Sequence, residues 1–405
     1  MEQLVGVEAV RAAQASLRGV IETTPVEHSR AIGDLVGGDV RLKCENLQRT
    51  GSFKLRGAHH RIARLSDDER RRGVVCASAG NHAQGVALAA KLQGVRATVF
   101  MPREAPLPKV DATQGYGAEV RLEGDTFDEA LATALEHAQE TGSVFVHPFD
   151  HPDIIAGQGT LGLELLEQVP DLGTVVVCVG GGGLLAGVAV ALRALRPDVR
   201  IIGVQAAGSA SFPASMAAGE AIASPTCDTI ADGIAVKRPG ELTLAHARQL
   251  VDEVVAVDDE EIARAVVLLL ERAKLVVEPA GAAGVAALLS GRVEVDASSP
   301  TVVTLSGGNI DPLMLQHLVT GGLTTEGRYV TLRTQVPDTP GQLSRLLRLL
   351  GDQRANVVGV SHHRLEHRLR LGQVEVVLEL ETRGHDHVAA LRSALEGEGY
   401  PLHRA

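Results

Sequence analysis

The sequence predicts an α/β protein with parallel sheets, followed by a smaller α+β unit. Two observations predict the first part: short β-branched and apolar runs alternate with helical segments, and several of these runs end in glycine-containing loops. Repeated strand–helix units place the strands in parallel and the helices on the faces of a sheet. A third observation predicts the second part, because the last segments follow the order β-α-β-β-α-β, which is the ferredoxin-like pattern.

Length and composition exclude several classes of protein. A chain of 405 residues that is 45% hydrophobic is too long for one ordinary core and indicates two or three units. A net charge of −11 without a basic run predicts no nucleic-acid partner. The four cysteines have no paired spacing, so we expect thiols in a reducing compartment. No apolar run reaches about 18 residues without glycine or charge, so we expect no membrane span and a cytoplasmic protein.

The first informative element is a predicted strand over residues 40–43, followed by an irregular turn. A helical run begins near Lys54, within the segment 50–58. An amine at such a turn can point into a cleft and form a Schiff base with an aldehyde, which is how pyridoxal phosphate is carried. Taken alone, a lysine is far more often a solvated surface residue. Three further segments carry residues that can bind other parts of the same cofactor.

The second element is a predicted strand over residues 74–77 that leads into a helix over 83–92. Small residues and an asparagine at a helix start leave backbone N–H groups free, and these suit a carboxylate. Asn81 can donate to a phenolate oxygen on a cofactor ring, although an N-cap role is the common alternative. We expect His82 to line the site and not to act as a base.

The third element is a predicted strand over residues 175–179 that runs into four glycines and an apolar helical segment. Successive glycine N–H groups and a helix N-terminus form an anion cradle suited to phosphate. The segment lacks the Gly-Lys-Ser/Thr ending of a nucleotide P-loop. It fits the dinucleotide fingerprint, but the next strand ends in Gln205 where an acidic residue is required. A tight structural turn is the plainer alternative.

The fourth element is a β-branched run over residues 301–305 that ends in Ser306-Gly307-Gly308-Asn309. Ligands in open α/β sheets bind beyond the carboxyl ends of the strands. The loops that follow the predicted strands can therefore converge on one crevice. In that crevice Ser306 can reach a ring nitrogen.

In this order and at this spacing, the four segments resemble the threonine ammonia-lyase (threonine dehydratase) branch of the fold-type II pyridoxal-phosphate enzymes. The resemblance covers residues from about 20 to 323 and implies a tryptophan synthase β-like fold with two parallel-sheet subdomains. It implies that Lys54 is the Schiff-base lysine, that Phe53 packs beside the ring, and that Asn81 and Ser306 bind the ring hydroxyl and the pyridine nitrogen. The implied phosphate loop is Gly180, Gly181, Gly182 and Gly183, and the implied substrate-carboxylate loop is Ser78, Ala79, Gly80, Asn81 and His82.

The resemblance also implies a reaction, the elimination that turns L-threonine, and also L-serine, into a 2-oxo acid and ammonia. Serine racemases of this fold carry a serine at the position of Ala79, and alanine cannot exchange a proton, so elimination is favoured over racemisation. Gln205 and Ser211 stand where those racemases use carboxylates for a divalent cation, so we expect no metal site. A serine dehydratase or racemase, a β-replacement enzyme and a catalytically silent amino-acid sensor remain alternatives.

A change of composition marks the last unit. Residues 321–327 are predicted to be a short glycine-containing linker. We expect a catalytic domain over residues 1–323, a linker over 324–328 and a regulatory domain over 329–405. By resemblance, residues from about 54 to 147 form a smaller mobile subdomain of the catalytic part.

The turn over residues 338–343 resembles the opening of an ACT regulatory domain. The resemblance implies a small effector, an amino acid or a nucleotide, bound near Asp338, Gly341 and Asn356. It also implies a homo-oligomer, a dimer or a tetramer. The alternative is a unit that only drives assembly. The sequence leaves open the preference between threonine and serine, the identity of the effector, and whether the role is isoleucine biosynthesis or amino-acid breakdown.

Overall fold

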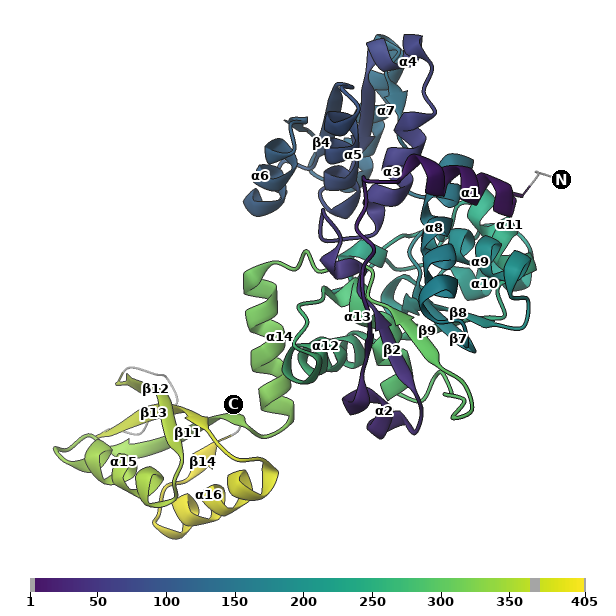
Figure 1. Cartoon of the computed structure of the whole chain (residues 1–405). Helices are drawn as coiled ribbons and strands as arrows, with labels where there is room; N and C mark the ends of the chain where they lie inside the picture. Colours follow the sequence, from purple (N-terminus) through teal and green to yellow (C-terminus); the bar gives the residue numbers. More distant parts are fainter. Residues whose placement is uncertain (1–3, 365–371, 404–405) are drawn as a thin grey trace. The chain divides into compact units, whose positions relative to one another are not determined.

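The computed structural model describes residues 4–364 and 372–403. The chain forms two compact units, Met1–Asp311 and Pro312–Ala405, which are described separately below (Figure 1). The first unit carries the parallel sheets and the second carries an antiparallel sheet. The predicted fold class, α/β followed by α+β, is therefore confirmed.

The main sheet of the first unit has the strand order β1-β2-β10-β7-β8-β9. Strand β1 is antiparallel to β2, and the other neighbours are parallel. Strands β7 and β10 are buried along their whole length, as expected for parallel strands that are covered on both faces. The strands span Val26–His28 (β1), Val40–Lys43 (β2), Thr174–Cys178 (β7), Arg200–Ala206 (β8), Glu253–Val257 (β9) and Thr301–Thr304 (β10).

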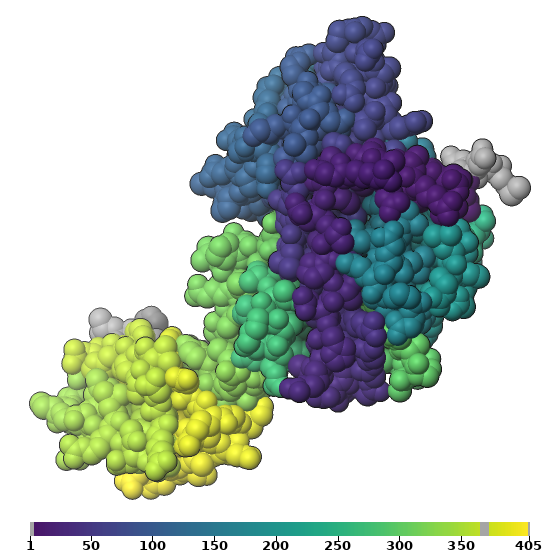
Figure 2. Space-filling view, in the orientation of Figure 1, coloured from purple at the N-terminus to yellow at the C-terminus, as the bar shows by residue number. Residues whose placement is uncertain are grey.

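Helices cover this sheet. Helices α8 and α9 pack against each other, and α1 lies across both, so that the N-terminal segment runs over their surface (Figure 2). The alanine-rich α13 approaches the sheet closely, because a Cβ added at Gly284 would lie 2.6 Å from the Val303 side chain. The helices span Val7–Ser16 (α1), Arg30–Val36 (α2), Pro152–Gln168 (α8), Gly183–Leu195 (α9), Phe212–Ala218 (α10), Glu241–Leu250 (α11), Asp259–Leu268 (α12) and Pro279–Leu289 (α13). Short helical turns span Glu45–Leu47 (η1), Ala207–Ser209 (η2), Asp232–Ile234 (η3) and Leu269–Ala273 (η4).

A second, smaller parallel sheet in the same unit has the order β5-β4-β3-β6. Its own apolar core includes Val74, Cys76, Val99 and Met101 from two strands of this sheet. The elements of this part span Lys54–Ala63 (α3), Asp67–Arg72 (α4), Val74–Ala77 (β3), Asn81–Leu92 (α5), Ala97–Met101 (β4), Leu107–Gly115 (α6), Glu119–Leu122 (β5), Phe127–Thr141 (α7) and Val144–Phe145 (β6). Two parallel sheets within one unit agree with the predicted pair of subdomains.

The second unit contains an antiparallel sheet in the order β12-β13-β11-β14. From Tyr329 onward its elements follow the predicted β-α-β-β-α-β order. Leu346 and Leu350 of one helix and Leu391 and Leu395 of the other are buried against the sheet. The elements span Pro312–Thr325 (α14), Tyr329–Pro337 (β11), Gln342–Asp352 (α15), Asn356–His363 (β12), Gln373–Glu381 (β13), His385–Gly397 (α16) and Leu402–His403 (β14).

The structure corrects the predicted linker. Helix α14 continues through Gly321 and ends at Thr325, so most of the segment 321–327 is helical. The Thr324 and Thr325 hydroxyls donate to the carbonyls four residues earlier, at Thr320 and Gly321, which ties the last turn together. Glycine lowers helix propensity by only about 1 kcal/mol, a cost that neighbouring interactions can offset.

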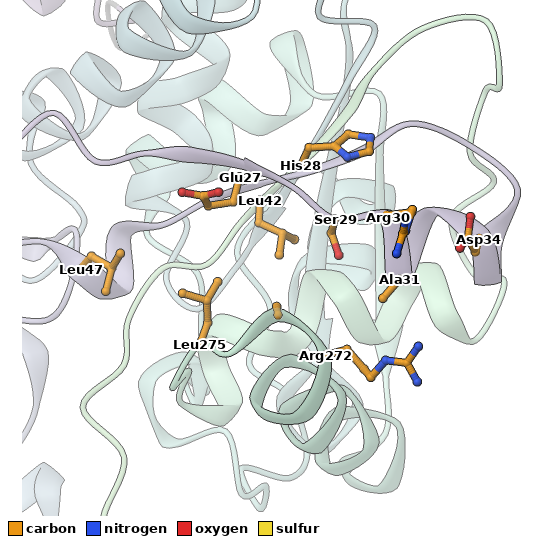
Figure 3. A pocket seen from close by; sticks show the side chains of 11 residues that line it. Glu27, His28, Ser29, Arg30, Ala31, Asp34, Leu42, Leu47, Arg272 and Leu275 are labelled. Atoms are coloured by element: carbon orange, nitrogen blue, oxygen red, sulfur yellow. The ribbon is translucent and has the colours of Figure 1, made fainter.

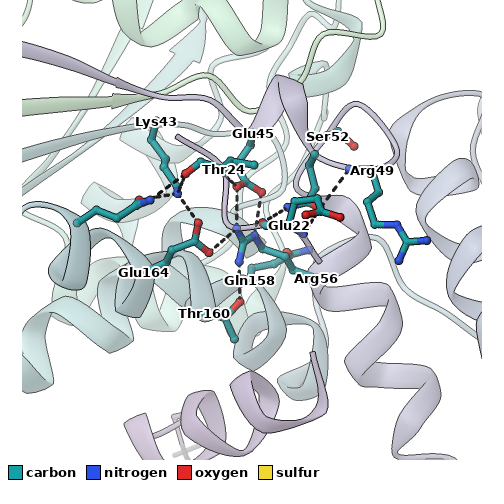
Figure 4. A network of polar contacts seen from close by, with 12 residues as sticks. Glu22, Thr24, Lys43, Glu45, Arg49, Ser52, Arg56, Gln158, Thr160 and Glu164 are labelled. Atoms are coloured by element: carbon teal, nitrogen blue, oxygen red, sulfur yellow. Dashed lines mark hydrogen bonds and ion pairs between the residues drawn. The ribbon is translucent and has the colours of Figure 1, made fainter. Parts of the chain in front are cut away.

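A buried network of charged side chains lies beneath the start of α3 (Figure 4). The Arg56 guanidinium, which is 0% exposed, donates to both oxygens of Glu45 at 2.7 and 2.8 Å and to Glu164 Oε2 at 2.8 Å. Lys43 Nζ, equally buried, donates to Glu164 and to the Thr24 carbonyl. Two cations thus face two carboxylates, and the network ties α3 to strand β2 and helix α8.

In the part of the chain that the structure describes, no helix combines the length and the apolar character that a membrane crossing requires.

Candidate active site

Four helices of the first unit begin at or beside residues of this site, and three of them begin at residues that the sequence singled out. Helix α3 begins at Lys54, α5 at Asn81, α9 at Gly183, and α13 directly after Glu278. None of these four helices has a side chain that caps its first turn. Uncapped helix N-termini offer backbone N–H groups and partial positive charge, which together favour an anionic ligand.

The Lys54 amine is enclosed by the protein. Its Nζ donates to the Pro148 carbonyl at 3.1 Å and lies 5.2 Å from the centre of the Phe53 ring. Burial lowers the pKa of Lys54 to about 8, although the charges of Cys178 and Glu278 act in the opposite direction. An amine with this pKa is available as a base and a nucleophile near neutral pH.

The glycine loop lies next to Lys54 through Pro148 and Phe149, which are consecutive in the chain. A Cβ added at Gly181 would lie 2.3 Å from the Phe149 ring, and one at Gly183 would lie 3.0 Å from its backbone. Gly182 has a φ of 94°, a left-handed conformation that favours glycine. Within the described residues, the N–H groups of this loop (Gly180–Gly183) donate to no other protein atom. Close approach and backbone conformation explain the glycines, and their free donors suit a phosphate.

Ser306 is joined to the Lys54 segment through the backbone. The Phe53 N–H donates to the Ser306 carbonyl at 3.1 Å, and Ser52 pairs with Gly307 in an isolated β-bridge. The side chain of Ser306 accepts a hydrogen bond from Cys178 Sγ at 3.1 Å. Since Cys178 ends β7 just before the glycine loop, Ser306 connects the lysine segment to that loop.

Asn81 lies in a chain of side-chain amides and a carboxyl group. Its Nδ2 donates to Glu278 Oε1 at 2.7 Å, and its Oδ1 accepts from Asn309 Nδ2 at 2.7 Å. Asn309 Nδ2 also donates to the Thr50 carbonyl at 2.7 Å. Burial, followed by the charge of Asp232, raises the pKa of Glu278 to about 7. These partners fix the orientation of the Asn81 amide, so that its second N–H remains for a ligand.

The predicted carboxylate loop is half-buried at the start of α5. Ser78 Oγ accepts from the Gly80 N–H at 3.1 Å, which shapes the turn, and Ala79 carries no polar side-chain atom. His82 is buried, and its Nε2 lies 2.8 Å from the Val146 carbonyl. Burial lowers the pKa of His82 to about 3, so the imidazole is neutral and holds the loop in place.

Sequence reasoning missed three polar residues of this site. Glu278 and Cys178 lie in runs that read as a helix start and a buried strand, so no local signal distinguishes them. Asn309, in contrast, is the last residue of the Ser306-Gly307-Gly308-Asn309 motif, but the sequence alone suggested no role for it. The predicted residues of the first unit are brought together by these additional contacts.

The structure does not bring the predicted effector residues of the second unit to one place in the same way. The Asp338 carboxylate pairs with Arg364 at 3.2 Å, and Asn356 Nδ2 donates to Glu381 at 3.0 Å. Of the predicted residues only Gly341 lines a groove of about 720 Å³ between α15 and the turn that follows α16. The charged residues that line this groove are Arg345, Arg348, Asp352 and Glu398.

A cavity of about 740 Å³ lies elsewhere in the first unit (Figure 3). None of the predicted site residues lines it, although its volume exceeds that of the groove in the second unit. Its lining includes two acidic side chains, Glu27 and Asp34, and two basic ones, Arg30 and Arg272. Among the described residues no group of three or more His, Cys, Asp or Glu side chains is placed to hold a metal ion.

The contacts around Lys54 fit a cofactor that carries an aldehyde and a phosphate. The amine with its lowered pKa suits the aldehyde, and the free N–H groups of the glycine loop at the start of α9 suit the phosphate. Asn81 and Ser306 supply polar groups that suit a heteroaromatic ring placed between them. Fold and site together define an enzyme that holds its cofactor on a lysine.

Comparison with known proteins agrees with this class. The family described as "Pyridoxal-phosphate dependent enzyme" matches residues 17–307, and the ACT domain matches residues 330–397. The L-threonine ammonia-lyase of Thermotoga maritima is 48% identical over 399 residues, which are 98% of this chain and 99% of that protein. The chain therefore belongs to the pyridoxal-phosphate dependent enzymes, with an ACT domain at its C-terminal end, and the predicted family and cofactor are confirmed.

Two further similarities cover the first unit. The catabolic L-threonine dehydratase of Escherichia coli strain K12 is 45% identical over 308 residues, which are 76% of this chain and 94% of that protein. The solved structure of maize serine racemase has a TM-score of 0.75 and 39% identity, and covers 80% of this chain and 100% of that one. Enzymes named for different reactions therefore share this fold.

Proposed function

We propose that the chain is a threonine ammonia-lyase, which converts L-threonine into 2-oxobutanoate and ammonia and accepts L-serine as a second substrate. The observation that carries the proposal is the Lys54 amine, enclosed at the start of α3 with a pKa of about 8. The 48% identity to the Thermotoga maritima L-threonine ammonia-lyase, over nearly the whole of both chains, supports the choice of substrate.

In this proposal the predicted residues bind different parts of the cofactor and the substrate. Lys54 holds the cofactor, Phe53 packs beside its ring, and the glycine loop holds its phosphate. Asn81 donates to the ring hydroxyl, and Ser306 faces the ring nitrogen. The segment Ser78–His82 binds the substrate carboxylate through backbone N–H groups at the start of α5, where the helix dipole favours an anion.

The proposed chemistry is carried by one base. The Lys54 amine removes the proton from the α-carbon of the substrate. When bound, the cofactor supplies an electron-withdrawing ring that stabilises negative charge at that carbon. The β-hydroxyl then leaves as water, for which the Lys54 ammonium or the phosphate group of the cofactor can supply the proton. The released enamine hydrolyses to the 2-oxo acid and ammonia, so the net change is threonine to 2-oxobutanoate and ammonia.

We further propose that the part from about residue 54 to 147 closes on the substrate. Lys109 on α6 reaches across to Asp232 on η3, with Nζ 2.6 Å from the carboxylate, and this ion pair joins the smaller part to the larger. Asp232 also raises the pKa of Glu278, so the pair lies close enough to the site to influence it electrostatically. Closure would exclude water from the base and the substrate.

For the second unit we propose an amino acid or a nucleotide as effector, and assembly into a dimer or tetramer. The ACT match supports the effector. Strand β12 supports assembly, because it is an edge of its sheet and exposes Val358 (57% exposed) and Val360 (38% exposed). We propose a cytoplasmic location, which the buried thiols Cys44, Cys76 and Cys178 support.

Release of 2-oxo acid by the purified full-length protein with pyridoxal phosphate tests the function, with L-threonine and L-serine offered separately. We expect Lys54→Ala to lose the visible absorbance of the bound cofactor and at least about a hundredfold in rate, because the amine acts as both anchor and base. Lys91→Ala, which changes an exposed lysine on α5, is the matched control and should behave as the unaltered protein. Substantial 2-oxo acid release by Lys54→Ala would contradict the assignment.

Serine racemase is the second candidate, since the maize enzyme shares the fold. Racemisation needs a second proton-transfer group on the other face of the substrate, and Ala79 offers none. We therefore expect no D-serine from the unaltered protein and a measurable amount from Ala79→Ser, followed by chiral chromatography of the amino acid pool. D-serine formed by the unaltered protein at a rate similar to pyruvate release would favour the racemase. A protein that binds cofactor but releases no 2-oxo acid would favour the silent sensor.

A further inference from the structure

Cys178 and Ser306 lie on neighbouring parallel strands beneath the site. Cys178 is the last residue of β7, and Ser306 follows the end of β10, which pairs with β7 in the sheet. Both side chains are almost fully enclosed, with 4% of Cys178 and 2% of Ser306 exposed. Cys178 Sγ donates to Ser306 Oγ at 3.1 Å, well within the distance for a hydrogen bond that involves sulfur.

The balance of donors and acceptors fixes where the Ser306 hydrogen can go. A serine hydroxyl has one hydrogen to donate and two lone pairs to accept with, and a thiol is a weak donor. Cys178 occupies one lone pair of Oγ, and within the described residues Oγ has no other partner. The Ser306 hydroxyl hydrogen is therefore left without a protein acceptor and is available to a ligand.

The opposite arrangement is unfavourable. If Ser306 donated to Cys178, its hydroxyl would form its one donated hydrogen bond with sulfur, which is a weak acceptor. The thiol must also be protonated to donate, and it is: burial raises the pKa of Cys178 to about 11, although the Ser306 hydrogen bond and the Lys54 charge oppose this. The thiol thus keeps its hydrogen throughout the neutral range.

We propose that Cys178 is a positioning residue that turns the Ser306 hydroxyl hydrogen toward the ring nitrogen of the bound cofactor. This inference rests on the proposed function, in which Ser306 faces that nitrogen. A nitrogen that accepts a hydrogen bond from a serine stays unprotonated, and the ring is then a weaker electron sink. A weaker sink shortens the life of negative charge at the α-carbon and favours prompt loss of the β-hydroxyl over transamination.

The test replaces the donor and follows the ring nitrogen directly. Cys178→Val removes the donor and keeps an apolar side chain of similar size, whereas Cys178→Ser keeps a donor. Cys76→Val, in the buried strand β3, is the matched control for loss of a buried thiol. Each full-length variant is loaded with ¹⁵N-labelled pyridoxal phosphate, and the ¹⁵N chemical shift of the ring nitrogen reports its protonation and its hydrogen bond.

We expect the unaltered protein, Cys178→Ser and Cys76→Val to show one common resonance of a hydrogen-bonded, unprotonated nitrogen. Cys178→Val should show a displaced resonance, together with a kcat that is lower by about three- to tenfold at nearly constant KM, as for the loss of one hydrogen bond. An unchanged resonance in Cys178→Val would overturn the proposal. If Cys178→Val fails to fold, Cys178→Ala supplies the same comparison.

Failure of the inference is distinguishable from failure of the proposed function. Ser306→Ala removes the hydroxyl itself, and we expect it to displace the ¹⁵N resonance at least as far as Cys178→Val does. If Ser306→Ala leaves the resonance unchanged, Ser306 does not face the ring nitrogen, and the proposed role of Ser306 is wrong. If Ser306→Ala displaces it and Cys178→Val does not, only the positioning role of Cys178 is wrong.

Discussion

At the scale of single residues, Lys54 meets two requirements that oppose each other. The amine must be held inside the protein, yet it must lose its proton near neutral pH. An ordinary lysine with a pKa of about 10.4 is only about 0.1% unprotonated at pH 7.5. With the pKa of Lys54 lowered by burial to about 8, roughly a quarter of the amines are unprotonated at that pH. Enclosure therefore supplies the reactive form without a separate base.

The lowered pKa predicts how cofactor capture depends on pH. Only the unprotonated amine reacts with an aldehyde, so the rate at which visible absorbance appears after pyridoxal phosphate is added to the cofactor-free protein should rise with pH. We expect the half-maximal rate near pH 8. Stopped-flow absorbance between pH 6 and 10 measures this, with Nα-acetyl-lysine amide as a reference for the titrations of the cofactor itself. A half-maximal rate at or above pH 10 would contradict the assigned environment of Lys54.

Some residues of the site could be predicted from the sequence, and others could not. Lys54, the glycine loop and Ser306 each belong to a short segment whose chemistry can be recognised locally. Glu278 is hydrogen bonded to Asn81, which lies 197 positions away in the chain, and Cys178 to Ser306, which lies 128 positions away. Such contacts exist only when distant segments have been brought together, so local patterns cannot reveal them.

At the scale of elements, the site is built from helix starts. The helices that begin at Lys54, Asn81 and Gly183, and the one that follows Glu278, all leave their first N–H groups uncapped by side chains. Some other helices of this chain do carry a side-chain cap, for example α12, in which Asp258 and Glu261 form a capping box. At α5 and α9 the residue before the helix is a glycine, which has no side chain that could cap the first turn, so the backbone donors there stay free for a ligand.

Strands and helices were predicted well where turn signals flank them. Strands β2 and β3 have the predicted bounds, 40–43 and 74–77, because glycine-containing turns precede them. The glycines of the segment 321–327 predict a linker, but helix α14 continues through them to Thr325. Hydrogen bonds from Thr324 and Thr325 to earlier carbonyls stabilise this last turn. Local propensity is thus a weaker guide wherever a helix continues across small residues.

The buried network of Figure 4 predicts a large effect on stability. Arg56→Met would leave Glu45 and Glu164 without their shared guanidinium in a fully buried place. Breaking such a buried pair from one side costs about 3–5 kcal/mol. We expect this loss in the free energy of unfolding, measured by urea denaturation of the cofactor-free protein. Arg64→Met, on the exposed end of α3, is the control, and equal stabilities of the two variants would contradict the role of the network.

At the scale of the whole molecule, the two units differ in their sheets and in the residues that they contribute to the proposed site. The first unit contains all predicted cofactor contacts, and the Escherichia coli relative matches 308 residues of this chain over 94% of its own length. The second unit adds an antiparallel sheet with a separate core. The proposed function therefore places catalysis in the first unit and its control in the second.

This division predicts the result of truncation. A chain that ends at Gly327 should keep most of its rate of 2-oxobutanoate release and lose its response to effectors. The measurement compares initial rates with and without each protein amino acid and AMP, for the full chain and the truncated chain. Asp338→Ala in the full chain should weaken the response without changing the basal rate. An effector response that survives truncation would show that the effector binds to the first unit.

The fold class could be predicted from the sequence because it depends on patterns that repeat along the chain. The alternation of strands and helices predicts parallel sheets, and the change of pattern after residue 328 predicts the second fold. Sheet order was not within reach, since nothing local indicates that β10 lies between β2 and β7. Hydrophobic patterns specify which face a strand buries, but not which strand is its neighbour.

The place of β10 has a consequence for biosynthesis. This strand is the last of its sheet to leave the ribosome, yet it fills the centre, between the early strand β2 and the middle strand β7. A nascent chain that lacks it exposes two open strand edges, which invite mispairing until translation has passed Thr304. Because the second unit follows β10 in the chain, this sheet can be completed while the rest of the chain is still being synthesised.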